Sequence, residues 1–119
     1  MVGKITPNYI EVRQGDNFTI LLQFKDETKP INITNSILKM QVKNKADLKT
    51  IITKQGIIDD GLNGKAHIAI VPDDTKKLNV EDEFVTDIQI TFANGEIHTI
   101  YPQAIDKVAS FIVSQHITE

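Results

Sequence analysis

The chain of 119 residues contains neither cysteine nor tryptophan, and Arg13 is its only arginine. Without cysteine it has no disulfide framework, no thiolate zinc site and no cysteine nucleophile. No apolar run approaches the ~18 residues that a membrane span requires, and the beginning, MVGKITPNYIEVRQGD, lacks the apolar stretch of ~7–15 residues of a signal peptide. We therefore expect a soluble protein with no membrane partner.

The sequence also lacks the short motifs of common catalytic and cofactor sites. It has no P-loop, no G-x-G-x-x-G and no G-x-S-x-G, and His67, His98 and His116 lack metal-ligand spacing. The net charge of -3 and the pI of about 5.6 do not favour nucleic acid. Tyr9 and Tyr101 are the only aromatic residues besides phenylalanine, which leaves little for stacking on sugars or bases. We expect a protein that is not an enzyme, with no cofactor and no nucleic-acid partner.

Charged residues gather in two stretches of opposite sign. The basic stretch contains Lys39, Lys43, Lys45, Lys49 and Lys54, and the acidic stretch contains Asp73, Asp74, Glu81, Asp82, Glu83 and Asp87. Such runs most often form a solvated face. Carboxylates could in principle exchange protons or bind a hard cation here, but acids with perturbed pKa values need burial that this polar context does not suggest. The alternative is docking, for which the candidates are Lys39, Lys43, Lys45, Lys49, Asp73, Asp74, Glu81, Asp82 and Glu83.

Alternation of apolar and polar residues predicts an all-β fold. In NFTILLQFKD every second residue is apolar, and only Leu21 breaks the period of two. Similar alternation in SILKMQVKN, KAHIAIVP, EFVTDIQITF and VASFIVSQHIT, with shorter candidates between them, gives about eight strands. The spacing predicts an immunoglobulin-like antiparallel β-sandwich of about 7–8 strands, forming one domain over residues 1–119. One short helical turn is expected near residues 73–78, capped by Asp73 or Asp74.

Three sequences predict turns. Gly15 and Asp16 precede a strand, and Asn94-Gly95 predicts a hairpin with a two-residue loop in which Phe92 faces Ile97, Ile90 faces Thr99 and Ile88 faces Tyr101. The third turn is expected at Asp59, Gly61 and Gly64, exposed between two strands, with Gly61 or Gly64 at positive φ.

The segment from Asp59 to Gly64 also resembles part of a calcium loop. Asp59 and Asn63 fit the first and fifth positions of an EF-hand loop and Gly64 fits the sixth, but the third is Gly61 and the twelfth is Ile70, within a predicted strand. Helices should flank such a loop, whereas strands are predicted here. We therefore favour a structural turn over a metal site.

Eight steps of the sequence, taken in order, resemble a family of bacteriophage tail proteins. They are Gly15-Asp16, Pro30-Ile31 to Ile33-Thr34, Lys39 to Lys43, Asp59 to Gly64, Pro72 to Leu78, Phe84 to Ile90, Asn94-Gly95 and Ala109 to Val113. The family is the immunoglobulin-like β-sandwich at the amino terminus of the baseplate upper protein of phages, with related prophage proteins. The chain departs from the family pattern at Ala109, where glycine is usual, and in the longer approach QAIDKVAS.

The resemblance implies structural work without catalytic residues. Such domains attach receptor-binding or fibre modules to the core of the baseplate, so the expected partners are other tail proteins, or further copies of the chain. The expected location is the virion tail, assembled in the bacterial host cytoplasm, and the chain can also be the amino-terminal module of a longer protein. The alternative is a bacterial surface or adhesion module that binds protein or carbohydrate.

Overall fold

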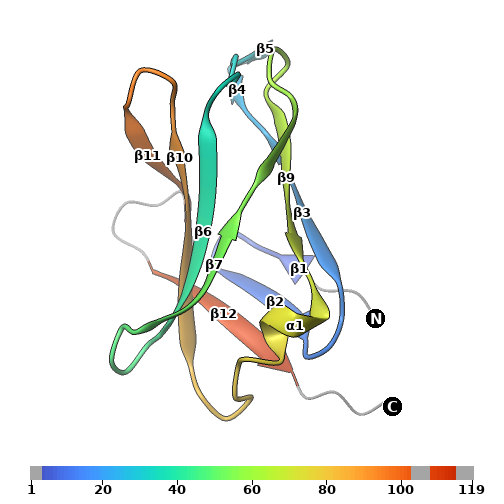
Figure 1. The fold of residues 1–119 in the computed structure, drawn as a ribbon, viewed down its shortest axis with the longest axis vertical. Coiled ribbons are helices and arrows are strands. Elements are labelled where there is room, and N and C mark those ends of the chain that lie inside the picture. The colour runs from blue at the N-terminus through green and yellow to red at the C-terminus, as the bar shows by residue number, and fades with distance from the viewer. Residues whose placement is uncertain (1–3, 103–107, 115–119) are drawn as a thin grey trace.

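The computed structural model describes residues 4–102 and 108–114 of the chain. Within them, two β-sheets pack face to face and one helical turn lies at the lower end of the sandwich (Figure 1). None of the helices among the described residues is long and apolar enough to cross a membrane.

The larger sheet has the strand order β1-β2-β12-β10-β6-β7, and β11 also pairs with β10. Its strands are β1 (Lys4–Ile5), β2 (Tyr9–Arg13), β6 (Ile37–Asn44), β7 (Thr50–Gln55), β10 (Phe84–Thr91), β11 (Ile97–Tyr101) and β12 (Ala109–Ser114). All these pairs are antiparallel except that of β12 with β2, which is parallel. The predicted sandwich is thus antiparallel apart from this one pair.

The smaller sheet has the order β3-β9-β8. Its strands are β3 (Phe18–Gln23), β8 (Ile57–Asp60) and β9 (Lys65–Ile70), and a separate two-residue pair joins β4 (Lys25–Asp26) to β5 (Lys29–Pro30). The chain passes from β7 in one sheet to β8 in the other through Gly56, which closes one side of the sandwich. Judged by their order along the chain and their neighbours in each sheet, β3, β8 and β9 occupy the places of strands B, D and E of an immunoglobulin domain. In the same way, β6, β10 and β12 occupy the places of C, F and G.

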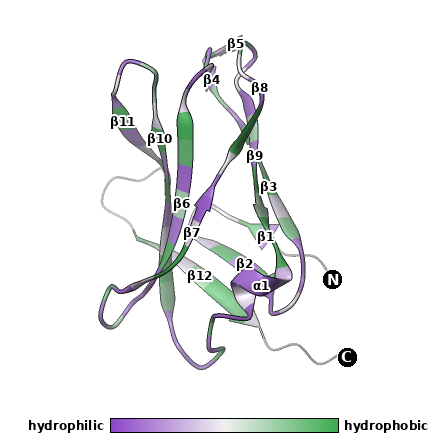
Figure 2. Cartoon of the chain, in the orientation of Figure 1, coloured by the Kyte–Doolittle hydropathy of each residue, from purple (hydrophilic) through white to green (hydrophobic). Residues whose placement is uncertain are grey.

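The core lies between the two sheets and follows from the alternation of the strands. Hydrophobic and hydrophilic residues follow one another along β6 and β9 (Figure 2). Leu38, Met40 and Val42 of β6 are buried, as are Ile68 and Ile70 of β9. The side chains of the larger sheet that complete this core include Ile10, Val12, Phe84, Ile88, Ala109 and Phe111. The immunoglobulin-like β-sandwich predicted from the sequence is therefore confirmed.

The eight predicted strands are all present, and the structure adds the short β1, β4, β5 and β8. The helical turn, α1, spans Pro72–Thr75 rather than 73–78. Its N-cap is Val71, which has an extended backbone and donates a hydrogen bond of 2.8 Å from its N–H to the carboxylate of Asp74. The predicted caps are wrong in this respect: Asp74 reaches back from the third position of the turn, and Asp73 is exposed.

The β10–β11 hairpin differs from its predicted register. Phe92 donates to the Glu96 carbonyl and accepts from the Gly95 N–H, both at 2.8 Å, so the loop has three residues. Gly95, at φ 92°, takes the left-handed conformation that ends a three-residue loop of this kind. The predicted pairs Phe92 with Ile97 and Ile90 with Thr99 are therefore wrong by one residue. A bulge further along restores the predicted pairing of Ile88 with Tyr101.

Candidate interaction surface

The basic and acidic stretches interleave on the larger sheet. Lys39 and Lys43 alternate with Gln41 on the outer face of β6, and the register places Asp87 of β10 opposite Gln41, between the two lysines. In the adjoining loops, the Lys45 ammonium lies 3.5 Å from the Glu83 carboxylate, with both side chains mostly exposed. An exposed pair of this kind contributes roughly 0–1 kcal/mol.

Asp74 is not part of an exposed acidic surface. Its carboxylate Oδ2 lies 3.0 Å from the Lys54 Nζ, and the Asp74 side chain is 10% exposed. The same oxygen accepts the hydrogen bond from the Val71 N–H. This pairing, which joins β7 to the start of α1, corrects the prediction that Asp74 belongs to a docking surface.

The other predicted docking residues remain accessible. Lys39, Lys49, Asp73, Glu81 and Asp82 are exposed, and Lys43 is half-buried. Among the described residues, no group of three or more histidine, cysteine, aspartate or glutamate side chains is placed to hold a metal ion. A docking role for the accessible residues stays a prediction.

The turn between β8 and β9 is shorter than predicted. Asp59 and Asp60 belong to β8, and the turn itself spans residues 61–64. The Asp60 carboxylate accepts a hydrogen bond of 2.7 Å from the Asn63 side-chain amide, and Asp59 lies 2.8 Å from Nδ1 of His67. Both carboxylates are thus engaged with neighbours in the chain.

Gly64 confirms the predicted positive φ, at 70°, but it is buried rather than exposed. A Cβ atom there would lie 2.5 Å from the Phe24 carbonyl oxygen and 2.8 Å from that of Ile31. Only glycine satisfies both the left-handed backbone and this close approach. At Gly61, φ is not positive, so the second of the two candidate glycines is not used in this way.

The turn at Gly15 and Asp16 is confirmed. Gly15 has φ 88°, and the Asp16 N–H donates to the Arg13 carbonyl at 3.0 Å. The Gly15 N–H donates to the hydroxyl of the fully buried Thr75 at 2.8 Å, which attaches this turn to α1. The turn is thereby a structural element of the lower end of the sandwich.

Neither tyrosine forms an exposed platform. Tyr101 is buried, and its hydroxyl donates a hydrogen bond of 2.8 Å to the Thr6 carbonyl. Burial raises the pKa of Tyr101 to about 12. Tyr9 is half-buried, and the Lys4 ammonium lies 5.5 Å from its ring centroid. His116, the third histidine of the sequence, lies outside the described residues.

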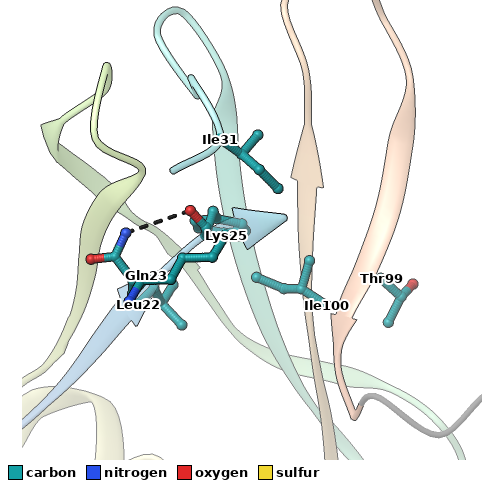
Figure 3. Close-up of a pocket in the computed structure, with 7 residues that line it drawn as sticks. Leu22, Gln23, Lys25, Ile31, Thr99 and Ile100 are labelled. Atoms are coloured by element: carbon teal, nitrogen blue, oxygen red, sulfur yellow. Dashed lines mark hydrogen bonds between the residues drawn. The ribbon is translucent and has the colours of Figure 1, made fainter. Parts of the chain in front are cut away.

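On the side of the sandwich opposite the β7–β8 crossover, no strand of residues 4–102 and 108–114 joins the two sheets, and this side is called the open side below. There a groove of about 370 Å³ lies between β3 and β11, and its apolar lining includes Leu22, Phe24, Ile31 and Ile100. Figure 3 shows Ile100 directed from β11 toward the segment that carries Leu22 and Lys25. Gln23, at the rim, donates a hydrogen bond of 2.7 Å to the Asn63 carbonyl.

The open side is bordered by β3, which among the described residues pairs with β9 along one edge only. Leu21, in the middle of β3, is 81% exposed on the outer face of the sheet. The sequence carried a signal for this surface, because Leu21 is the residue that breaks the alternation in NFTILLQFKD. Alternation alone could not indicate which strand lies at an edge, since that depends on the pairing of distant segments.

No family model matches the chain, and no curated protein matches it. Among solved structures, CopC from Methylosinus trichosporium OB3b is similar over 99% of this chain and 97% of its own, with a TM-score of 0.49 and 11% identity. Murine CRIg is similar over 94% of this chain and 96% of its own, with a TM-score of 0.41 and 11% identity. Similarities at this level carry no argument about function.

Proposed function

We propose that this chain is a non-catalytic structural component of a phage or prophage tail, in which it attaches receptor-binding or fibre modules to the core of the baseplate. The sequence resemblance to baseplate proteins motivates the proposal. Its partners are other tail proteins, and it acts in the virion after assembly in the host cytoplasm.

The observation that carries the proposal is that the candidate ligand carboxylates are paired within the chain. The carboxylates that looked most like ligands face partners within the chain: Asp59 faces His67, Asp60 faces Asn63 and Asp74 faces Lys54. Titratable groups at a reaction centre converge on a cleft, whereas Asp59 and Asp60 lie in β8 and Asp74 lies apart from them in α1. What the described surface offers a partner is unpaired backbone along β3 and the apolar groove beside it.

The steps of the resemblance have structural roles that support the same proposal. Gly15, Gly64 and Gly95 have positive φ in turns, and the segment Pro72 to Leu78 ends with Leu78 in the core. These positions maintain a scaffold, and binding to partners depends on the shape complementarity of its surface. A surface module that binds carbohydrate receives less support, because both tyrosines are packed against the chain.

The proposal is tested by tagging the gene in its natural host, inducing or propagating the phage, and analysing density-purified particles by mass spectrometry. We expect the chain to co-purify with tail proteins in a fixed ratio, and we expect deletion of its gene to give tails without their fibre or receptor-binding modules. An untagged strain and a tagged cytoplasmic host protein serve as controls. Recovery of the chain from the bacterial surface, with none in the particles, would refute the proposal and favour an adhesion module.

A further inference from the structure

Within its own described sequence, β3 lacks the protective features that natural sheets place on exposed edge strands. Charged side chains, proline and short length normally prevent such an edge from pairing with another chain. From Asn17 to Phe24 the sequence NFTILLQF contains no charged residue and no proline, and β3 is six residues long. Such an edge is an acceptor for a further strand.

The other edge strands in the described part of the chain each carry at least one of these features. Lys4 lies in the two-residue β1, Lys54 in β7, two aspartates in β8, and His98 in β11, which is followed by Pro102. β3 therefore stands apart from its neighbours in chemistry as well as in position.

The backbone groups that face outward from β3 can be assigned from its pairing with β9. The Phe24 N–H donates to the Gly64 carbonyl at 2.8 Å, so the even-numbered residues of this segment direct their N–H and C=O groups toward β9. Because these directions alternate along an antiparallel strand, Thr19, Leu21 and Gln23 direct theirs to the free edge.

The same segment has a symmetric pattern about Leu21. Reading outward from it, Ile20 corresponds to Leu22, Thr19 to Gln23 and Phe18 to Phe24, so that apolar residues match apolar residues and polar match polar. A two-fold axis through Leu21 would set each residue of one strand opposite its counterpart in an antiparallel second strand. A register shifted by two residues would instead set Leu21 against Thr19 and Phe24 against Asp16.

We infer that two copies of this chain associate through β3, paired antiparallel with Leu21 at the two-fold axis, so that their smaller sheets join into one sheet of six strands. Thr19, Leu21 and Gln23 of each copy exchange main-chain hydrogen bonds with the other. The two Leu21 side chains, each 81% exposed in the single copy, then lie side by side on the outer face.

The half-buried side chains of the inner face fit this arrangement. Phe18 and Phe24 are both partly exposed at the two ends of the segment, and pairing places Phe18 of one copy opposite Phe24 of the other. Because Phe24 lines the groove between β3 and β11, the second copy borders the open side of the sandwich. The pairing is a property of the purified chain, so its failure would leave the proposed tail function standing, and the reverse holds as well.

Cross-linking gives the first test, and the absence of native cysteine gives it a clean background. Hydrogen-bonded residues opposite each other in an antiparallel pair have Cα atoms ~5.5 Å apart, within the range that a disulfide bridges. Leu21→Cys is expected to form a covalent dimer under mild oxidation. Leu62→Cys, at a position that is 71% exposed in the β8–β9 turn, is the matched control and is expected to form no covalent dimer. Equal cross-linking of the two variants, or none at position 21, would overturn the inference.

Charge exchange gives the second test, because only this register places position 21 opposite itself. Leu21→Lys and Leu21→Glu should each raise the dissociation constant of the homodimer by about tenfold or more, since like charges meet and the leucine contact is lost. An equimolar mixture of the two variants should associate again, and sedimentation equilibrium measures all three samples. Restored association also shows that both variants are folded. A monomeric wild-type chain, undiminished self-association of either variant, or a mixture no tighter than its components would each refute the pairing.

Discussion

Replacement of Asp74 by alanine is expected to destabilise the fold far more than the same change at its neighbour Asp73. The Asp74 carboxylate accepts the Val71 N–H at the start of α1 and pairs with the Lys54 ammonium at 3.0 Å. Asp73 is exposed at the surface of the same turn. The two positions differ in contacts but share residue type and helical turn, which makes Asp73→Ala a matched control.

The magnitude follows from the two contacts. A hydrogen bond to a charged acceptor contributes roughly 1.5–3 kcal/mol to stability. The ion pair adds about 1 kcal/mol, because Lys54 is 24% exposed and Asp74 10% exposed, between the limits of surface and buried pairs. We therefore expect Asp74→Ala to lower the free energy of unfolding by about 3 kcal/mol, and Asp73→Ala by about 0.5 kcal/mol or less. Asp74→Asn, which retains an acceptor for the Val71 N–H, should fall between them.

Urea denaturation measures these changes by linear extrapolation, with an unchanged slope as evidence that only stability has altered. A double-mutant cycle with Lys54→Met isolates the ion pair, and the two losses should be less than additive. The reasoning is refuted if Asp74→Ala costs no more than Asp73→Ala. It also fails for the ion pair if the losses at Lys54 and Asp74 add without coupling.

Three further changes test other parts of the fold. Gly64→Ala should cost at least about 2 kcal/mol in unfolding free energy, because its Cβ would meet two carbonyl oxygens. Gly95→Ala, with nothing within 4 Å of the added Cβ, should cost only about 1 kcal/mol of backbone strain. Equal losses of the two variants in urea denaturation would contradict this expectation. Thr75→Val leaves the Gly15 N–H without its acceptor and should lower the free energy of unfolding by about 1–2 kcal/mol, whereas Thr75→Ser should retain most of this stability. Equal stability of the two variants in calorimetry would argue against the contact. The raised pKa of Tyr101, about 12 against an ordinary 10, means that the folded state holds the phenol proton more tightly than the unfolded state. The stabilisation from this proton is complete below pH 10 and is lost between pH 10 and 12, by at most about 3 kcal/mol. Tyr101→Phe should abolish that part of the pH dependence of the unfolding free energy.

Much of the fold could be predicted from local sequence pattern. Where one face of a strand is buried, a period of two fixes which residues point inward, as in Leu38, Met40 and Val42. The turns at Gly15, Gly64 and Gly95 could also be predicted from the sequence, because each of them has a positive φ, which favours glycine. These features depend on neighbours in sequence.

Features that depend on distant contacts could not be read in the same way. Asp74 looks like its exposed neighbour Asp73 in sequence, and only the approach of Lys54 from β7 determines that it is paired. The hairpin register differs from the predicted one because Asn94-Gly95 also fits a three-residue loop that ends at Gly95. The free edge of β3 depends on the placement of β2, which lies in the other sheet, parallel to β12, and so leaves one side of β3 without a described partner.

The central structural claim is that two copies of this chain pair through the free backbone edge of β3. Its most direct test is residue-resolved amide hydrogen exchange at increasing protein concentration. The amides of Thr19, Leu21 and Gln23, which face the free edge, are predicted to gain protection as concentration rises, while Leu22, whose amide faces β9, and the amides of the β7 edge change little. Exchange at those three amides that stays independent of concentration, or protection that grows along β7 instead, would contradict the account.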